Sequence, residues 1–173
     1  DNKNISFAPN CVYSQLLVDD LIHVDFHAAT LRIIEGKDDF LLAKVISGGV
    51  VGSNKAVNIN REIELDPITK KDSEAFHIGK KLGITSFALS FTNSADDVKR
   101  VREIIGMDVN LISKIESIRG VLNLDEILPL VDEILIDRGD LSREVAIEKI
   151  PFLQRRIISK ARSKNVPVYV ATN

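Results

Sequence analysis

The chain has 173 residues, of which 45% are hydrophobic, and a formal net charge of -2. This length allows one ordinary domain or two small ones with a real core, which excludes disorder as the dominant state. Acidic and basic residues are interspersed without a basic stripe, so the sequence argues against a nucleic-acid partner. No run approaches the roughly 20 apolar residues of a membrane span, and the first residues lack a secretory pattern. We therefore expect a soluble, cytoplasmic protein without a membrane partner.

The first third of the chain has the pattern of short β-strands. Three runs rich in strand-forming residues, LLVDD at 16–20, ATLRIIEG at 29–36 and FLLAKVISGG at 40–49, are separated by Asp, Asn and Gly positions that suit turns. We expect residues 1–58 to belong to an all-β domain.

From about residue 69 helical and strand patterns alternate. Helices are predicted near 70–82, 95–105, 120–129 and 147–164, and strands at 84–91, 109–116, 133–137 and 166–172. This alternation indicates parallel pairing and an α/β architecture. No glycine-rich loop follows the first strand, which argues against a nucleotide-binding doubly wound sheet. We expect residues 59–173 to form part of a (β/α)8 barrel, which needs eight strands when complete.

The predicted strand at 109–116 carries two charged side chains on one face. Side chains alternate along a strand, so Lys114 and Glu116 point the same way at its carboxyl end. Barrels of this class place their chemistry at that end. The alternative is an ion pair on an exposed strand, typically worth less than about 1 kcal/mol.

The next strand, EILID, runs directly into Arg138, Gly139 and Asp140. A glycine there lets the backbone approach a ligand and exposes its N–H group. Asp140 and Glu116 could together hold a hard divalent cation such as Mg²⁺, which takes further ligands from water and substrate oxygens. The alternative is a simple turn with Asp140 near a helix start. Thr172 and Phe91 end predicted strands at the same rim, and each alone is explained by strand propensity.

The string HVDFH offers a different metal-site pattern. A strand period would put His23, Asp25 and His27 on one face, as a site with two histidines and one carboxylate requires. A solvated strand face gives the same pattern without a metal, and we favour that interpretation.

Seven strings together indicate a family resemblance. In chain order they are VDDLIHV, GGVVGSNKAVN, ITKKD, SFALSFTNSADDVKRVREIIG, LISKIESIRGVLNLDEIL, IDRGDLSREV and PVYVATN. Their order and near-spacing resemble the pyruvate kinase family over nearly the whole chain, most specifically in the lysine-x-glutamate and arginine-glycine-aspartate-leucine strings. The resemblance implies part of the lid domain at 1–58 and part of the catalytic barrel at 59–173. It also implies phosphoryl transfer from phosphoenolpyruvate to ADP, giving pyruvate and ATP, in a homo-oligomeric full-length protein.

The resemblance also implies roles for individual residues. Lys114 matches the catalytic lysine that stabilises the transferring phosphoryl group and the enolate oxygen. Glu116 and Asp140 match the two carboxylate ligands of Mg²⁺. The family usually also requires K⁺, but the barrel strands that supply the K⁺ ligands have no counterpart in this sequence.

Further matches concern the substrate and the nucleotide. The backbone at Gly139 and Asp140, with the Thr172 hydroxyl, corresponds to the pocket for the substrate carboxylate, and Thr172 also lies near the methyl carbon that is protonated. Phe91 resembles the aromatic residue that packs beside the substrate. Asp20 and Lys55 match lid positions that face the nucleotide.

The sequence departs from the family pattern at several positions. Asp137 stands where an alanine is usual, Ser142 and Leu21 where glycines are usual, Asn54 in place of a lysine and Asn173 in place of a glutamine. Asp137 adds negative charge near the expected metal site. Two alternatives follow: a non-catalytic binding or scaffolding module, and an aldolase or lyase that acts on pyruvate through a magnesium enolate.

Overall fold

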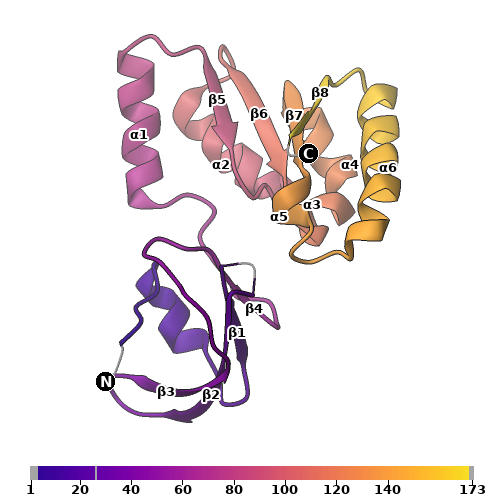
Figure 1. The fold of residues 1–173 in the computed structure, drawn as a ribbon. Coiled ribbons are helices and arrows are strands. Elements are labelled where there is room, and N and C mark those ends of the chain that lie inside the picture. The colour runs from indigo at the N-terminus through magenta and orange to yellow at the C-terminus, as the bar shows by residue number, and fades with distance from the viewer. Residues whose placement is uncertain (1–3, 26, 172–173) are drawn as a thin grey trace. The chain divides into compact units, whose positions relative to one another are not determined.

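The computed structural model describes residues 4–25 and 27–171 (Figure 1). The chain divides into two compact units, the first ending at Leu65 and the second beginning at Asp66. In the part of the chain described, no helix combines the length and the apolar character needed to cross a membrane.

The first unit is built on a four-stranded antiparallel sheet with the order β3-β2-β1-β4. Its strands are β1 (Leu21–Val24), β2 (Ala29–Gly36), β3 (Leu41–Ser47) and β4 (Val57–Ile59), and a 3-10 helix, η1 (Asn10–Gln15), precedes them. Strand alternation turns Ile22 and Val24 into the core and leaves His23 on the opposite face. Residues Val12 and Leu16, at and after η1, pack into the same core.

One sequence expectation for this unit is wrong. The run at 16–20 is not a strand: Asp19 has a φ of 74°, and the Asp20 carboxylate accepts the Leu17 N–H at 2.7 Å. These local contacts make a turn, and the strand starts only at Leu21. The antiparallel sheet agrees with the expected β character of residues 1–58, and the short 3-10 helix η1 is an addition to it. The predicted strands at 29–36 and within 40–49 are confirmed as β2 and β3.

The second unit is an α/β structure with a parallel sheet of order β5-β6-β7-β8. Its strands are β5 (Ser86–Leu89), β6 (Asn110–Ile115), β7 (Glu133–Asp137) and β8 (Val168–Ala171). Its helices are α1 (Lys70–Lys81), α2 (Ala95–Ile105), α3 (Ile118–Leu122), α4 (Leu124–Ile127), α5 (Arg138–Leu141) and α6 (Ile150–Ser163), with 3-10 turns η2 (Leu128–Leu130) and η3 (Ile147–Lys149).

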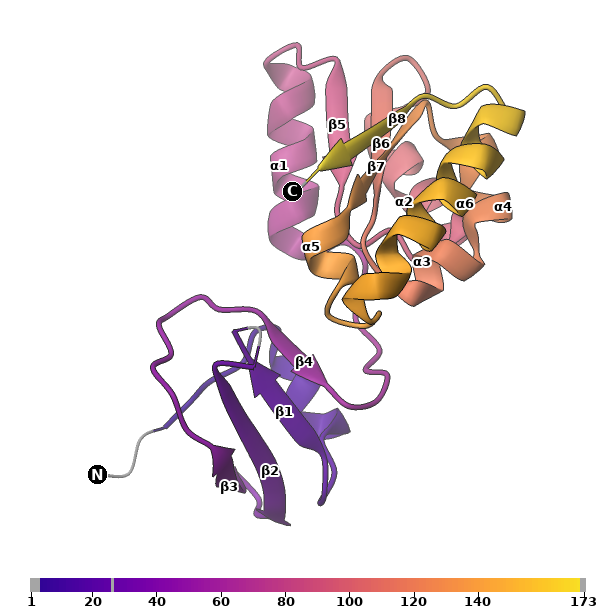
Figure 2. The ribbon, with the colours of Figure 1, turned by 45° about the vertical axis from the view of Figure 1, so that its right-hand side comes forward.

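The two faces of this sheet differ. Helices α2, α4 and α6 lie along one face (Figures 1 and 2), where Leu111 and Ile134 are fully buried against them. The residues that alternate with these, including Ile112 and Leu135, are only half-buried. The side chain of Lys114 belongs to this second face, which is therefore the face that the site uses.

The helices largely follow their sequence signals. Capping boxes formed by Thr69 with Asp72 and by Ser94 with Asp97 start α1 and α2. The predicted helix at 120–129 is instead three short pieces, α3, α4 and η2, because the chain turns at Asn123 and reaches Pro129. The short helix α5, directly after β7, was not among the predicted helices, and it agrees with the alternative that placed Asp140 near a helix start.

Candidate functional site

Lys114 and Glu116 meet at the carboxyl end of β6. The Lys114 Nζ atom lies 2.6 Å from Glu116 Oε1, and the Phe91 N–H donates to Glu116 Oε2 at 2.6 Å. The Glu116 residue is only 1% exposed. A buried carboxylate is costly unless it is paired, and here an ammonium and a backbone donor compensate its charge. The sequence expectation that these two side chains share one face is confirmed.

Asp137 and Asp140 lie beside this pair, at the end of β7 and in α5. Asp137 Oδ1 accepts the N–H groups of Gly139 at 3.1 Å and Asp140 at 3.3 Å, so Asp137 is the N-cap of α5. Its Oδ2 lies 3.9 Å from Lys114 Nζ. Asp140 Oδ1 contacts the Arg143 guanidinium at 2.8 Å. A lysine, an arginine and three carboxylates thus gather at one edge of the sheet.

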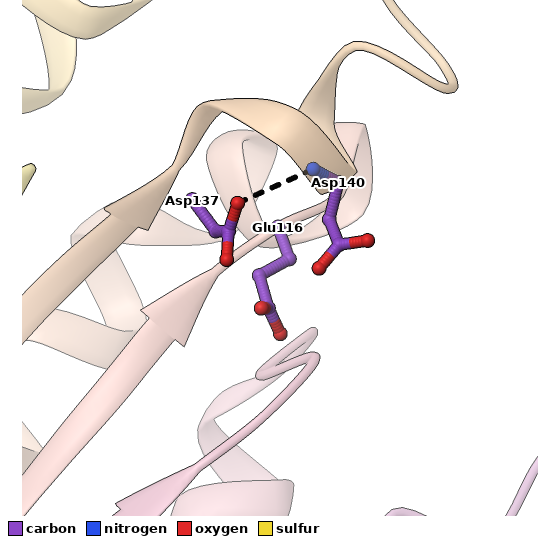
Figure 3. Close-up of side chains that lie close together, drawn as sticks. All are labelled: Glu116, Asp137 and Asp140. Carbon is purple, nitrogen blue, oxygen red and sulfur yellow. Dashed lines mark hydrogen bonds between the residues drawn. The ribbon is translucent and has the colours of Figure 1, made fainter. Parts of the chain in front are cut away.

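The three carboxylates of Glu116, Asp137 and Asp140 offer oxygens that all lie within 4.8 Å of one another (Figure 3). Mg²⁺ binds oxygens at about 2.0–2.1 Å, so opposite ligands of one ion are about 4 Å apart. The donor set contains only oxygens, which is the chemistry that hard cations prefer. These residues therefore fit a divalent cation such as Mg²⁺ with small side-chain movements.

Sequence reasoning identified two of these three carboxylates. It treated Asp137 as a source of added negative charge and not as a possible ligand. The signal was present, because an aspartate at the last position of a buried strand carries its carboxylate to the same edge as Glu116.

Phe91 contributes through its backbone. Its side chain is exposed, and its φ of 49° is uncommon for a bulky residue, which indicates local strain in the turn after β5. That conformation directs its N–H to Glu116. Thr172 lies outside the described residues, and the last described residue, Ala171, pairs with Asp137 in the sheet.

Asp20 and Lys55 belong to the first unit and have partners there. The Asp20 carboxylate is buried and accepts from Arg61 Nε at 2.7 Å. The hydrogen bond from Arg61 lowers the pKa of Asp20, although burial acts in the opposite direction. Lys55 Nζ pairs with Asp25 at 3.2 Å. Their role toward a nucleotide stays a prediction.

The pattern expected for HVDFH is only partly formed. Strand β1 ends at Val24, and both Asp25 and His27 have positive φ values, so a strand period does not apply to them. Asp25 turns to Lys55, while the Nδ1 atoms of His23 and His27 approach to 2.9 Å. The expectation that all three side chains share a strand face is therefore wrong.

Parallel strands with a lysine and a carboxylate cluster at their carboxyl ends define an α/β protein with a candidate divalent-cation site. A family model described as "Pyruvate kinase, barrel domain" matches residues 1–173. The chain belongs to the pyruvate kinase family.

Curated relatives support this assignment. The pyruvate kinase of Clostridium perfringens is 33% identical over 99% of this chain and 37% of its own length. Pyruvate kinase 1 of Saccharomyces cerevisiae is 34% identical over 88% of this chain and 31% of its own. The pyruvate kinase of Geobacillus stearothermophilus is 34% identical over 93% of this chain and 28% of its own. The chain thus spans about a third of the length of these relatives.

Proposed function

We propose that this chain supplies the metal-binding and enolate-stabilising part of a pyruvate kinase, which transfers a phosphoryl group from phosphoenolpyruvate to ADP. The contact between Lys114 and buried Glu116, next to Asp140, carries the proposal. Residues 1–58 would then be part of the lid domain, and residues 59–173 part of the (β/α)8 barrel. We also propose that the protein containing this chain is a glycolytic enzyme that forms a homo-oligomer in the cytoplasm.

Lys114 would hold positive charge where the reaction needs it. Phosphoryl transfer spreads negative charge over the phosphoryl oxygens, and an enolate oxygen gains charge as the donor bond breaks. Glu116 holds the Lys114 ammonium at 2.6 Å, so the charge is already positioned before substrate binds. Fixed charges of this kind stabilise a transition state without reorganising during the reaction.

The carboxylates would hold the divalent cation. Glu116 and Asp140 are the proposed Mg²⁺ ligands, and bound Mg²⁺ would supply further positive charge beside the phosphoryl and enolate oxygens. The family resemblance also suggests a requirement for K⁺. The Mg²⁺ assignment is supported by the structure of the chain itself, in which oxygens of the three carboxylates lie within 4.8 Å of one another.

The remaining roles concern the two substrates. The N–H groups of Gly139 and Asp140, with Thr172, would bind the carboxylate of phosphoenolpyruvate, and Thr172 would also act in protonation of the enolate. Phe91 would border the substrate. Asp20 and Lys55 would face ADP or ATP.

One observation favours a non-catalytic binding or scaffolding module instead. Asp137 accepts the two N–H groups that the substrate carboxylate would use, and it places a negative charge 3.9 Å from Lys114. Both contacts oppose binding of an anionic substrate.

A lactate-dehydrogenase-coupled assay tests the proposal. The sample is the longest native polypeptide that contains this segment, supplied with phosphoenolpyruvate, ADP, Mg²⁺ and K⁺. We expect ADP-dependent pyruvate formation that is lost in Glu116→Gln and in Asp140→Asn. A folded protein that forms no pyruvate would contradict the proposal. Mg²⁺ binding by that protein would then favour a lyase, and absence of Mg²⁺ binding would favour the non-catalytic module.

A further inference from the structure

His23 and His27 form a close imidazole pair in the first unit. Their Nδ1 atoms are 2.9 Å apart, their ring centroids 4.2 Å apart, and the rings are tilted by 54°. His23 lies on β1, opposite Thr30 of β2 and Asn58 of β4. His27 lies in the turn between β1 and β2. The carboxylate cluster of the second unit shares no residue with this pair.

The turn after β1 holds the second histidine in place. The Asp25 N–H donates to Ala56 O at 2.9 Å, and the Ala28 N–H donates to Asp25 O at 3.0 Å. Asp25 and His27 adopt φ values of 50° and 68°, which few non-glycine residues adopt. Lys55 neutralises Asp25 at 3.2 Å. The turn therefore returns the His27 ring to the strand face that carries His23.

The ring geometry differs from that of a linear hydrogen bond. A linear N–H···N bond of 2.9 Å would put the imidazole centroids about 5 Å apart, because each nitrogen lies on the line between the rings. Two imidazoles bound at a right angle to one ion, with metal–nitrogen distances of about 2.0–2.1 Å, have nitrogens about 2.9 Å and centroids about 4.5 Å apart. The observed 2.9 Å and 4.2 Å are closer to the second arrangement.

The Nδ1 atom of His23 has two close polar neighbours. His23 Nδ1 lies 2.9 Å from His27 Nδ1 and also 3.1 Å from Thr30 Oγ1. In a neutral imidazole this nitrogen has either one proton or one lone pair. A neutral imidazole nitrogen that has a lone pair can instead bind a metal ion.

We propose that His23 and His27 bind one divalent late transition-metal ion through their Nδ1 atoms. The right-angle separation suits the tetragonal or octahedral geometry of Cu²⁺ or Ni²⁺. Tetrahedral Zn²⁺ would separate two such nitrogens by about 3.3 Å. Water fills the other positions, and the Thr30 hydroxyl lies close enough to hydrogen-bond to such a water.

Calorimetric titration of the tag-free 173-residue chain with Ni²⁺, and then Zn²⁺, tests the site. Excess Mg²⁺ in the buffer fills the carboxylate cluster of the second unit. We expect one Ni²⁺ per chain with micromolar affinity, and weaker binding of Zn²⁺. The affinity for Cu²⁺ is a weaker test of this site, since Cu²⁺ binds most nitrogen ligands tightly. Its paramagnetic resonance spectrum should instead show coupling to two nitrogens.

The chain has three histidines, so three single variants show how much each one contributes to Ni²⁺ binding. His23→Asn and His27→Asn should each weaken Ni²⁺ binding at least tenfold, and asparagine tolerates the positive φ at position 27. His77→Asn is the matched control, since His77 is exposed on α1 and bonds to Ser73 O. Circular dichroism checks that each variant folds.

Three results would overturn the proposal. The first is Ni²⁺ binding that survives in His23→Asn or His27→Asn, or that falls equally in His77→Asn. The second is absence of Ni²⁺ binding to the folded wild-type chain. Tighter binding of Zn²⁺ than of Ni²⁺ would contradict the right-angle geometry on which the proposal rests.

Discussion

The Lys114 ammonium lies 2.6 Å from the carboxylate of Glu116, a residue that is almost completely buried. The two charges compensate each other, and the Phe91 N–H also donates to the Glu116 carboxylate. The same contact that balances a buried charge thus also fixes a lysine at the candidate site.

If the proposed function is correct, Lys114→Met should abolish phosphoryl transfer by the longest native polypeptide that contains this segment. Loss of such a fixed charge often lowers turnover about 100-fold or more. The variant should still fold, with a loss of about 3 kcal/mol in the free energy of unfolding, because Glu116 loses its ion pair. Coupled assay and urea unfolding measure the two effects. Lys99→Met is the control, since its pair with Asp96 is exposed and should contribute little to stability.

Asp137→Ala should strengthen binding of the anionic substrate if the proposed function is correct. The change removes a negative charge near Lys114 and releases the N–H groups of Gly139 and Asp140. The KM for phosphoenolpyruvate should fall, while loss of the N-cap costs about 1 kcal/mol of stability. Asp137→Asn keeps an acceptor oxygen and should show a smaller fall. An increase in KM in both variants would assign Asp137 a supporting role in the site.

Arg61→Met should destabilise the first unit and reduce its acid sensitivity. The hydrogen bond from Arg61 lowers the pKa of Asp20 against the opposing effect of burial. The stabilisation is therefore complete above the unfolded pKa of about 3.9 and is lost as pH falls through the lower folded value. At neutral pH we expect a loss of stability, because the Asp20 carboxylate keeps its charge and loses its partner. The midpoint of urea unfolding, followed as the pH is lowered, measures both effects.

The control for Arg61→Met is Lys37→Met, which removes an exposed pair with Glu35. Its unfolding midpoint should barely change. If Arg61→Met unfolds with the same acid dependence as wild type, then Asp20 does not couple protonation to stability.

Gly120→Ala should destabilise the second unit by about 2 kcal/mol or more, because overpacking at a buried backbone contact forces the chain to move. A Cβ at this buried position would lie 2.5 Å from the backbone oxygen of Thr92. Gly36→Ala is the control, since its Cβ would meet only the Leu41 side chain at 3.5 Å. Thermal unfolding of the two variants compares them, and equal melting temperatures would contradict the predicted clash.

The sequence predicted the elements with strong local signals. Strand β7 was predicted with its observed bounds, and α2 likewise, because apolar periodicity and the Ser94 capping box act within one segment. The 16–20 run failed because the Asp20 side chain binds Leu17 and Arg61, and the second contact joins distant parts of the chain. Composition alone does not reveal such long-range contacts.

In the candidate site, too, local sequence patterns predicted some features and longer-range or backbone contacts set the others. Alternation along β6 correctly placed Lys114 and Glu116 together. The N–H of Phe91 could not be predicted, because a backbone donor is independent of side-chain type and depends on an unusual φ. The capping role of Asp137 depends on α5, a four-residue helix too short to leave a periodic pattern.

The order β5-β6-β7-β8 leaves β5 and β8 with one strand partner each among the described residues. The edge strand β8 also carries exposed side chains, such as those of Tyr169 and Val170. Unpaired strand edges are templates for other chains. The 173-residue chain should therefore self-associate as its concentration rises. This self-association would limit the protein concentration that can be used for spectroscopy or crystallisation.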